Sequence, residues 1–428
     1  MRDQLQHPKD VITAFMERIY GYGMTTTSGG NLSIKDGEGN IWITPGAIDK
    51  GTLTRNDIMC VKPDGTLLGR HKPSSEFPFH KAVYDCRPDV KAVLHAHPPA
   101  LVSFSIVRKV PDTGVLPNAR YICGEVGYAP YGIPGSEQLG RNIAGVFEKG
   151  FDTVLLENHG VVTAGESLSQ AFKRFETLDF CARLTIQANT IGTPRPLTQA
   201  QLDFANSFRP TLGEFTPEYH SPEEIDLRIR MVQLIQRSYN KMLFNSTEGT
   251  FSVRVSPNSF LITPYGIDRQ EVTVDDLVLI QYGKREAGKR PSRSARMHEA
   301  IYAAHPDLNC IIMAQPPSLM SFAVTGIPFD TRTIPESYIL LRDVTMLPFA
   351  SHYKDIHVLG KVLSSRRPMA IIENECVVSV GENLLQAFDR LEVAEYSAKA
   401  LTAARSLGEL IPISEKQTAD LRQAFNLK

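Results

Sequence analysis

The sequence predicts a layered α/β fold that is built twice along the chain. Motifs of the first half return in the second half, and in each half helix-like segments bracket a set of short strand-like runs. The length of 428 residues supports this prediction, because it exceeds one ordinary core and suits two domains of about 200 residues. We expect residues 1–208 to form the first domain, 209–221 a linker and 222–428 the second domain.

The internal repeat is visible when the two halves are placed side by side. Residues 93–99, Val-Leu-His-Ala-His-Pro-Pro, return as residues 311–317, Ile-Ile-Met-Ala-Gln-Pro-Pro. Residues 156–162, Leu-Glu-Asn-His-Gly-Val-Val, return as residues 372–378, Ile-Glu-Asn-Glu-Cys-Val-Val. The offset between matching motifs changes by only a few residues along the chain, which indicates two full-length copies that differ by short loop deletions.

The elements expected in each half follow from the spacing of apolar residues. Residues 11–20 and 225–243 have the spacing of amphipathic helices, and the second of these follows a proline-rich break. Each half then ends in a long helix-like segment, at 168–190 and 384–407. Between the helices of the first half, we expect strands over residues 31–34, 41–44, 91–97 and 153–156.

The composition favours small molecules as partners. The chain has 46 basic and 47 acidic residues and a formal charge of −1, so no net charge attracts nucleic acid or an acidic membrane surface. The start of the chain is polar and no window of about 18 apolar residues occurs, so we expect no membrane segment. The six cysteines are scattered without a C-x-x-C pair, which favours a reducing cytoplasm over a disulfide framework.

Three histidines of the first half are the predicted metal ligands. Residues 92–97 have the apolar pattern of a strand, whose period of two places His95 and His97 on one face. His159 follows the strand-like residues 154–156 at a glycine-containing turn, from which it can approach the same pocket. Three neutral imidazoles with one open coordination position are typical of a catalytic zinc site.

The second half serves as an internal control for this interpretation. At the positions of the three histidines it has Met313, Gln315 and Glu375, while the surrounding residues persist. Histidines that only fill a core would be expected to change independently. Their joint loss therefore favours metal binding by the first half.

The same comparison points to one carboxylate. Glu76 precedes a predicted helix over residues 77–84 and is replaced by Ser294 in the second half. A carboxylate that is lost together with the metal ligands is a candidate general acid/base beside the metal. The alternative is a glutamate that only caps the helix.

Other polar residues persist in both halves and are interpreted as structural. His80 of the first half returns as His298, although the second half lacks the metal ligands. The pair at residues 157–158 returns at 373–374, and we expect it to hold the turn.

A loop of small residues suggests an anion pocket in the first half. Residues 28–31, Ser-Gly-Gly-Asn, allow backbone N–H groups to approach an anion closely. The second half has Thr-Glu-Gly-Thr at 247–250, where the glutamate would repel a phosphate. Ser74 and Ser75 offer hydroxyl groups, so we expect a phosphate or carboxylate pocket here.

Taken together, these motifs resemble the class II aldolase/adducin family. The resemblance covers most of residues 8–195, and residues 222–407 resemble the same domain without its chemistry. It implies three-layer α/β/α domains, each with a mostly antiparallel central sheet, and Zn²⁺ or another divalent cation such as Mn²⁺, Co²⁺ or Fe²⁺. The motifs that carry it are Ser28-Gly-Gly-Asn31, Ile43-Thr-Pro45, Pro73-Ser-Ser-Glu76, His95-Ala-His97-Pro, Ala129-Pro-Tyr131 and Glu157-Asn-His159-Gly.

The resemblance assigns roles to particular residues. It implies that His95, His97 and His159 hold the metal. Glu76 would be the acid/base, and Tyr121 is the nearest candidate for a proton donor that the family's aldolases take from a neighbouring subunit.

The resemblance also implies a phosphate pocket made of Gly30, Asn31, Ser74 and Ser75. One departure concerns residues 44–47, Thr-Pro-Gly-Ala, because the family usually has serine or threonine and then glycine after Thr-Pro. The missing hydroxyl leaves open a substrate without a phosphate, or with an anion placed differently.

The function implied by these roles is that of a metal-dependent aldehyde-lyase. It would cleave a ketose phosphate such as L-fuculose 1-phosphate by a retro-aldol reaction into dihydroxyacetone phosphate and an aldehyde. A methylthioribulose-1-phosphate dehydratase remains an alternative, whereas the family's 4-epimerases usually carry aspartate at the position of Glu76. A non-catalytic, adducin-like interaction protein would lack the ligands that the first half has.

The resemblance further implies an assembly. The family's sites form between neighbouring domains of a four-membered ring, so two chains would supply four domains and two metal sites. We therefore expect a homodimer with a four-domain ring, or a higher homo-oligomer.

Overall fold

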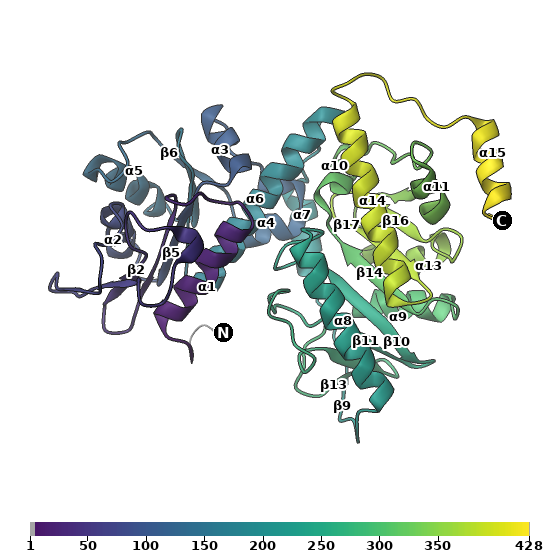
Figure 1. Cartoon of the computed structure of the whole chain (residues 1–428). Helices are drawn as coiled ribbons and strands as arrows, with labels where there is room; N and C mark the ends of the chain where they lie inside the picture. Colours follow the sequence, from purple (N-terminus) through teal and green to yellow (C-terminus); the bar gives the residue numbers. More distant parts are fainter. Residues whose placement is uncertain (1–4, 428) are drawn as a thin grey trace. The chain divides into compact units, whose positions relative to one another are not determined.

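Each half of the chain forms its own compact unit around one β-sheet (Figure 1). The computed structural model describes residues 5–427. Unit 1 contains the described residues up to Thr113 together with Asn118–Arg183. Unit 2 contains Gly114–Pro117 and the described residues from Leu184 onward. The two-fold use of an α/β domain is therefore confirmed.

The expected elements of the first half are present within a few residues of their predicted ends. The helices α1 and α6 and the strands β1, β2, β5 and β7 cover the six segments that apolar spacing indicated there. The elements run α1 (Pro8–Gly21), β1 (Asn31–Lys35), β2 (Ile41–Ile43), β3 (Met59–Val61), β4 (Leu67–Leu68), α2 (Phe77–Cys86), β5 (Ala92–Ala96), α3 (Pro99–Ile106), α4 (Pro117–Cys123), β6 (Gly127–Ala129), α5 (Glu137–Phe147), β7 (Thr153–Leu156), β8 (Val161–Gly165) and α6 (Leu168–Ile191).

The sheet of unit 1 is mostly antiparallel, as expected. Its eight strands lie in the order β4-β3-β2-β1-β5-β8-β7-β6. Every neighbouring pair is antiparallel except β6 and β7. Strands β1, β5 and β8 lie next to one another at the centre, and this places the segments that carry the predicted site side by side.

Side chains that alternate along the central strands build the two faces of this sheet. Leu94 and Leu155 belong to a core cluster with α1 and α6, whereas their neighbours Val93 and Val154 belong to a cluster with α2 and α5. This period of two is the expected behaviour of a strand covered on both faces. Unit 1 therefore has three layers, helices on either side of one sheet.

The second half repeats this order of elements. They are α7 (Gln199–Ser207), β9 (Glu214–Phe215), α8 (Pro222–Asn240), β10 (Thr250–Ser256), β11 (Ser259–Ile262), β12 (Val278–Gln281), β13 (Lys284–Glu286), α9 (Ala295–Ala304), β14 (Cys310–Ala314), α10 (Pro317–Thr325), α11 (Pro335–Leu341), β15 (Thr345–Leu347), α12 (Ser351–Lys354), α13 (Val358–Val362), β16 (Met369–Ile372), β17 (Cys376–Gly381), α14 (Leu384–Ala404) and α15 (Glu415–Ala424).

The sheet topology of unit 2 matches that of unit 1 strand by strand. The strands of unit 2 lie in the order β15-β16-β17-β14-β10-β11-β12-β13. This is the order of unit 1 read from β6 to β4, with each strand replaced by its repeat, and β9 is added at the edge. The pairs β15–β16 and β13–β9 are parallel and the others antiparallel. Helices α9 and α13 cover one face of this sheet, and α8 and α14 cover the other (Figure 1).

The first helix of each repeat begins with the same local signals. In α1 the side chain of His7 caps the start and Pro8 occupies the first helical position. In α8 Ser221 accepts a hydrogen bond from the N–H of Glu224, and Pro222 follows it. Proline suits this position because its missing N–H would have no partner inside the helix.

Three further observations concern the expected linker, membrane segments and cysteines. The segment expected as a linker contains β9, whose Glu214 pairs with Arg285 of β13. None of the described helices is long and apolar enough to cross a membrane. All six cysteines are free thiols.

In the loop after β2, residue 47 is alanine where the family motif has glycine, and we expect this difference to affect the stability of the fold. Ala47 has a φ of 55°, in the left-handed region, while the matching residue of the second repeat is Gly266 with a φ of 78°. A Cβ on Gly266 would meet no atom within 4 Å, so only the backbone conformation distinguishes the two positions. For an L-residue this conformation costs about 1–2 kcal/mol.

We expect Ala47→Gly to raise the free energy of unfolding and Gly266→Ala to lower it, each by about 0.5–1 kcal/mol. The relief of backbone strain exceeds the entropy that an extra glycine adds to the unfolded chain. Chemical denaturation of both variants measures the two changes. Shifts of the same sign would contradict the assignment of left-handed strain to Ala47.

Candidate metal centre in unit 1

Two neighbouring strands bring the three predicted ligands together. His95 lies near the end of β5, and His97 follows just beyond it. His159 lies in the turn between β7 and β8, where Asn158 adopts a φ of 52°. Because β5 and β8 are antiparallel neighbours, with His95 opposite Val162, this turn lies beside the end of β5.

The three imidazoles form one compact cluster. One nitrogen from each ring can be chosen so that all three lie within 4.8 Å of one another. The ring centroids are 4.6 Å apart for His95 and His97 and 4.8 Å apart for His95 and His159. The Nε2 atoms of His95 and His97 approach to 2.9 Å. Among residues 5–427 no other group of three or more histidine, cysteine or acidic side chains meets this geometry.

Burial keeps these imidazoles in the neutral form that binds metals. Desolvation lowers the pKa of His95 and that of His97 to about 3, and it lowers the pKa of His159 as well. The Nδ1 atom of His95 lies 2.9 Å from the carbonyl oxygen of Val161. Nδ1 therefore carries the proton that it donates to this oxygen, and Nε2 keeps its lone pair toward the cluster.

Glu76 stands against this cluster. It is buried at the N-terminal cap of α2, and its Oε2 lies 3.3 Å from Nε2 of His95. Its Oε1 lies 3.7 Å from Nε2 of His159. The residue predicted as acid/base and those predicted as ligands thus meet in one place.

The donor set and its unpaired atoms fit a divalent cation. Nδ1 of His159 and Oε1 of Glu76 are buried without a hydrogen-bond partner, which is uncommon for polar atoms in a folded protein. Three neutral imidazoles are a typical ligand set for zinc and for other divalent transition metals. A cation bound by them would also balance the buried charge of Glu76.

A chain of hydrogen bonds links Glu76 to the interior of the unit. Nδ2 of Asn31 donates to Oε2 of Glu76 at 2.7 Å, and Oδ1 of Asn31 lies 2.5 Å from Nε2 of His80. On the other side of its ring, His80 Nδ1 lies 2.7 Å from Oγ of Ser33, which in turn lies 2.7 Å from the hydroxyl of Tyr84. Strand pairing explains the first contact, since Asn31 of β1 lies directly opposite His95 of β5.

The other residues of the predicted phosphate pocket lie next to His95 or in the segment that leads into Glu76. Gly30 has a φ of 74°, and a Cβ there would lie 2.9 Å from the carbonyl oxygen of His95. Ser74 is buried and its Oγ accepts a hydrogen bond from the N–H of Glu76, while Ser75 is exposed next to it.

Tyr121 lies at a different place in unit 1. It is 59% exposed and lines a cavity of about 350 Å³ together with Lys149, Asp152 and Arg174. This cavity lies where β6 and β7 begin, whereas His159 follows the end of β7. Within one chain, the structure does not bring Tyr121 together with the other predicted site residues.

Two glycines, Gly29 and Gly160, support the cluster in a role that was not predicted from the sequence. A Cβ on Gly29 would lie 2.8 Å from Nδ1 of His97, and one on Gly160 would lie 2.6 Å from Cδ2 of the same ring. The signal was present in the repeat, because these positions hold Glu248 and Cys376 in the second half. Both glycines change together with the histidine that needs their space.

The matching place in unit 2 holds a different set of side chains. Nε2 of Gln315 donates to the carbonyl oxygen of Glu375 at 2.6 Å. Nδ1 of His352 lies 3.1 Å from Oε2 of Glu375. Thr250, which replaces Asn31, instead shares a hydrogen bond with Ser292.

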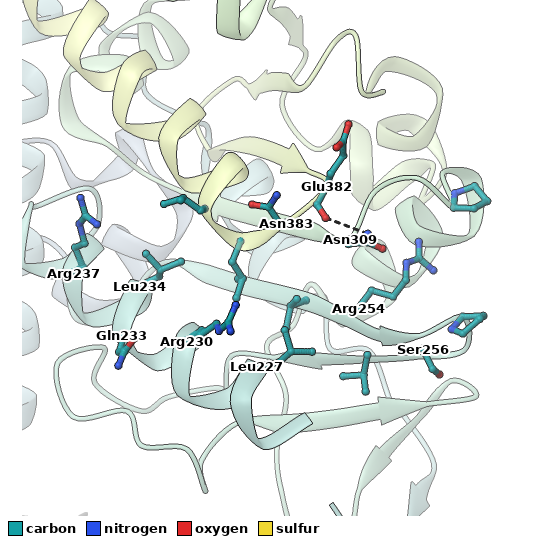
Figure 2. Close-up of a pocket in the computed structure, with 16 residues that line it drawn as sticks. Leu227, Arg230, Gln233, Leu234, Arg237, Arg254, Ser256, Asn309, Glu382 and Asn383 are labelled. Carbon is teal, nitrogen blue, oxygen red and sulfur yellow. Dashed lines mark hydrogen bonds between the residues drawn. The ribbon is translucent and has the colours of Figure 1, made fainter. Parts of the chain in front are cut away.

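Unit 2 also has a cavity of about 900 Å³ beside α8 and the start of α14, shown in Figure 2. Its arginines already have partners. Arg230 pairs with Asp226, and Arg237 lies 3.8 Å from Glu392. Arg254 donates to backbone carbonyl groups. These pairings leave the cavity without a free cationic side chain among the three arginines.

The fold and the site define a protein with two copies of one three-layer domain, of which the first has a three-histidine cluster beside a buried carboxylate. The chain belongs to the class II aldolase and adducin family. The family's domain, described as the class II aldolase and adducin N-terminal domain, matches residues 10–186 and again residues 229–402. This match confirms both the resemblance and the duplication.

Curated relatives align with about half of the chain or less. An L-fuculose phosphate aldolase of Methanococcus maripaludis is 32% identical over 173 residues, which cover 40% of this chain and 93% of the relative. A 5-deoxy-D-ribulose 1-phosphate aldolase of Bacillus thuringiensis serovar kurstaki is 32% identical and covers 46% and 93%. A 3-oxo-tetronate 4-phosphate decarboxylase of Haemophilus influenzae is 31% identical and covers 43% and 90%.

Solved structures of the same kind are also similar. YgbL of Escherichia coli, described as a putative aldolase/epimerase/decarboxylase, is 29% identical with a TM-score of 0.44, and the match covers 46% of this chain and 97% of that one. An L-fuculose 1-phosphate aldolase is 28% identical with a TM-score of 0.42 and covers 46% and 93%.

Proposed function

We propose that the chain is a metal-dependent aldehyde-lyase that cleaves a ketose 1-phosphate into dihydroxyacetone phosphate and an aldehyde. The observation that carries this proposal is the position of Glu76, whose two carboxylate oxygens lie 3.3 Å from His95 and 3.7 Å from His159. A general base must lie within reach of the proton that it moves, and a substrate bound at the histidines would meet this requirement. Two curated relatives described as aldolases of sugar phosphates support the substrate class.

In this proposal residues 1–208 form the catalytic domain, and residues 222–428 form a domain that has lost its metal ligands. His95, His97 and His159 hold the cation, which is Zn²⁺ or another divalent metal. When bound, such a cation polarises the substrate carbonyl group and stabilises the negative charge that develops on its oxygen.

Glu76 performs the proton transfers of the reaction. It accepts the proton of the substrate hydroxyl group while the adjacent carbon–carbon bond breaks and the aldehyde forms. The carbon that loses this bond then takes up a proton, and Glu76 is placed to return the one it accepted. Ser75, Gly30 and the first turn of α2 supply donors for the phosphate group.

A β-oxo acid phosphate is a second candidate substrate. The decarboxylase of Haemophilus influenzae matches about as well as the aldolases do. In both reactions the carbon next to a ketone loses a carbon–carbon bond and is then protonated. They differ in whether an aldehyde or carbon dioxide leaves, and decarboxylation needs no hydroxyl proton to be removed.

A screen of phosphorylated substrates tests the proposal. The purified, metal-supplemented chain would be incubated with ketose 1-phosphates and with 3-oxo-tetronate 4-phosphate, and dihydroxyacetone phosphate, aldehyde and carbon dioxide would each be measured. Equal amounts of dihydroxyacetone phosphate and aldehyde support the aldolase. Release of carbon dioxide instead supports the decarboxylase, and background rates with every substrate would contradict both and direct the search to dehydration of the methylthioribulose-phosphate type.

We also propose that two chains assemble into a ring of four domains. In such an assembly Tyr121 of one chain, which lies away from the metal ligands of its own unit, can serve the site of another. Light scattering of the purified chain should give twice the chain mass or a multiple of it. A fully active monomer would contradict this assembly.

A further inference from the structure

His80 has one partner more than its repeat in unit 2. In both units this histidine is buried, and its Nδ1 lies 2.7 Å from a serine hydroxyl, that of Ser33 for His80 and that of Ser252 for His298. A tyrosine hydroxyl follows each serine. Only the Nε2 atoms differ, because that of His80 lies 2.5 Å from Asn31 while that of His298 is buried without a partner.

The donor and the acceptor of each hydrogen bond in this network can be assigned by starting from Glu76. The carboxylate of Glu76 only accepts hydrogen bonds, so the amide nitrogen of Asn31 must face it and the amide oxygen must face His80. Nε2 of His80 must then carry a proton and donate it. A neutral imidazole has one proton, so Nδ1 accepts from Ser33, and the hydroxyl of Tyr84 donates to Ser33.

Every hydrogen bond in this network is donated toward Glu76, and the network ends at its carboxylate. Turning the amide of Asn31 around would place its oxygen against the carboxylate of Glu76, which is repulsive. His80 prevents this turn, because its Nε2–H needs an acceptor and finds it in the Asn31 oxygen. In unit 2 Asn31 and Glu76 are replaced by Thr250 and Ser294. Nε2 of His298 therefore has no amide to bond to.

We propose that His80 is a positioning residue for Glu76, acting through the amide of Asn31. This inference rests on the proposed role of Glu76 as acid/base and adds a function to a residue whose retention in both repeats indicates structure alone. The bond shared by both units holds the fold, and the bond made only in unit 1 holds the carboxylate in place beside the histidine cluster. Hydrogen-bond partners behind metal ligands contribute about 10- to 100-fold to metal affinity or activity, and we expect an effect of similar size for this partner of Glu76.

Two substitutions separate the two bonds of His80. The amide of asparagine reaches as far as Nδ1, so His80→Asn retains a partner for Ser33 and removes the donor to Asn31. The amide of glutamine reaches as far as Nε2, so His80→Gln retains that donor. We expect His80→Asn to lower kcat by about 10- to 100-fold with KM and metal content unchanged, and His80→Gln to retain most of the activity.

His298→Asn is the matched control in the same full-length chain. It makes the same change beside the equivalent serine and tyrosine. Because unit 2 has no counterparts of Asn31 and Glu76, it should leave kcat unchanged. Thermal melts of all three variants show the cost to the fold. A His80→Asn protein with normal kcat, or a His298→Asn protein with an equal loss of kcat, overturns the proposal.

A double-mutant cycle tests the route through Asn31. If His80 acts through this amide, His80→Asn has little further effect on kcat in an Asn31→Ala background, whereas independent effects multiply and overturn the proposal. A crystal structure of the His80→Asn protein provides a test that needs no substrate. We expect the side chains of Asn31 and Glu76 to be displaced, and unchanged positions would overturn the proposal even if the proposed reaction itself proves wrong.

Discussion

Glu76→Gln is expected to abolish most of the catalytic activity while leaving the fold and the metal site intact. The amide has the shape of the carboxylate and its oxygen can still accept the hydrogen bond from Asn31, which spans 2.7 Å in the structure. It cannot accept the substrate proton. Loss of a general base lowers kcat by about 10²- to 10⁴-fold.

The measurement is kcat and KM for the substrate that the screen identifies, together with metal content by elemental analysis. Ser294→Ala is the matched control, since Ser294 occupies the same helix-cap position in unit 2. It should leave kcat unchanged. If Glu76→Gln retained kcat within a few-fold of the unchanged protein, Glu76 would not be the acid/base.

His97→Gln is expected to remove the metal from the protein. The substitution installs the residue that the second repeat has at this position, Gln315. Without the imidazole of His97, only two of the three clustered ring donors remain. We expect the metal affinity to fall by at least about 100-fold, because even residues behind the ligands contribute 10- to 100-fold.

Metal-dependent thermal stability tests this prediction without any substrate. A cation that binds only the folded state at 100 times its Kd adds about 2.7 kcal/mol to the free energy of unfolding. Zn²⁺ should therefore raise the melting temperature of the unchanged chain and not that of His97→Gln. Gln315→Ala is the matched control in unit 2, and it should leave the effect of Zn²⁺ on the melting temperature unchanged because Gln315 does not belong to the histidine cluster.

A large part of the fold could be predicted from the sequence. The apolar spacing of residues 11–20 predicted α1, and the Ala, Leu and charged residues of 168–190 predicted α6. The strand ends of β1 and β7 agree with the expected ends within one residue. The strands were indicated by short runs of apolar and β-branched residues. Short strands such as β4, with only two residues, carry no such signal.

Because the domain is duplicated, the residues of the site could be predicted from the sequence. His95, His97 and His159 are replaced together in the second half, as is Glu76. The structure gathers the three histidines into one cluster and places Glu76 3.3 Å from His95 and 3.7 Å from His159. Comparing two repeats inside one chain identifies residues that change as a set. It does not show which atoms touch.

The placement of Tyr121 illustrates this limit. Resemblance to a family assigned it a role at the site. In the structure it lies where β6 and β7 begin, at the end of these strands that is away from His159, and this position depends on how the strands are arranged. For the same reason the role of Gly160 became visible only when the distance to the ring of His97 was known.

The sequence by itself determined that the chain is a tandem repeat, and that three histidines and a carboxylate of the first copy, predicted as metal ligands and acid/base, are replaced in the second copy. These conclusions depend on residue identities and their spacing, which are properties of the chain alone. Only the tertiary structure decided that Asn31 lies opposite His95 across a strand pair and joins Glu76 to His80. The physical reason is that hydrogen bonds between residues more than 40 positions apart are set by sheet register and side-chain direction, which exist only once the strands have paired.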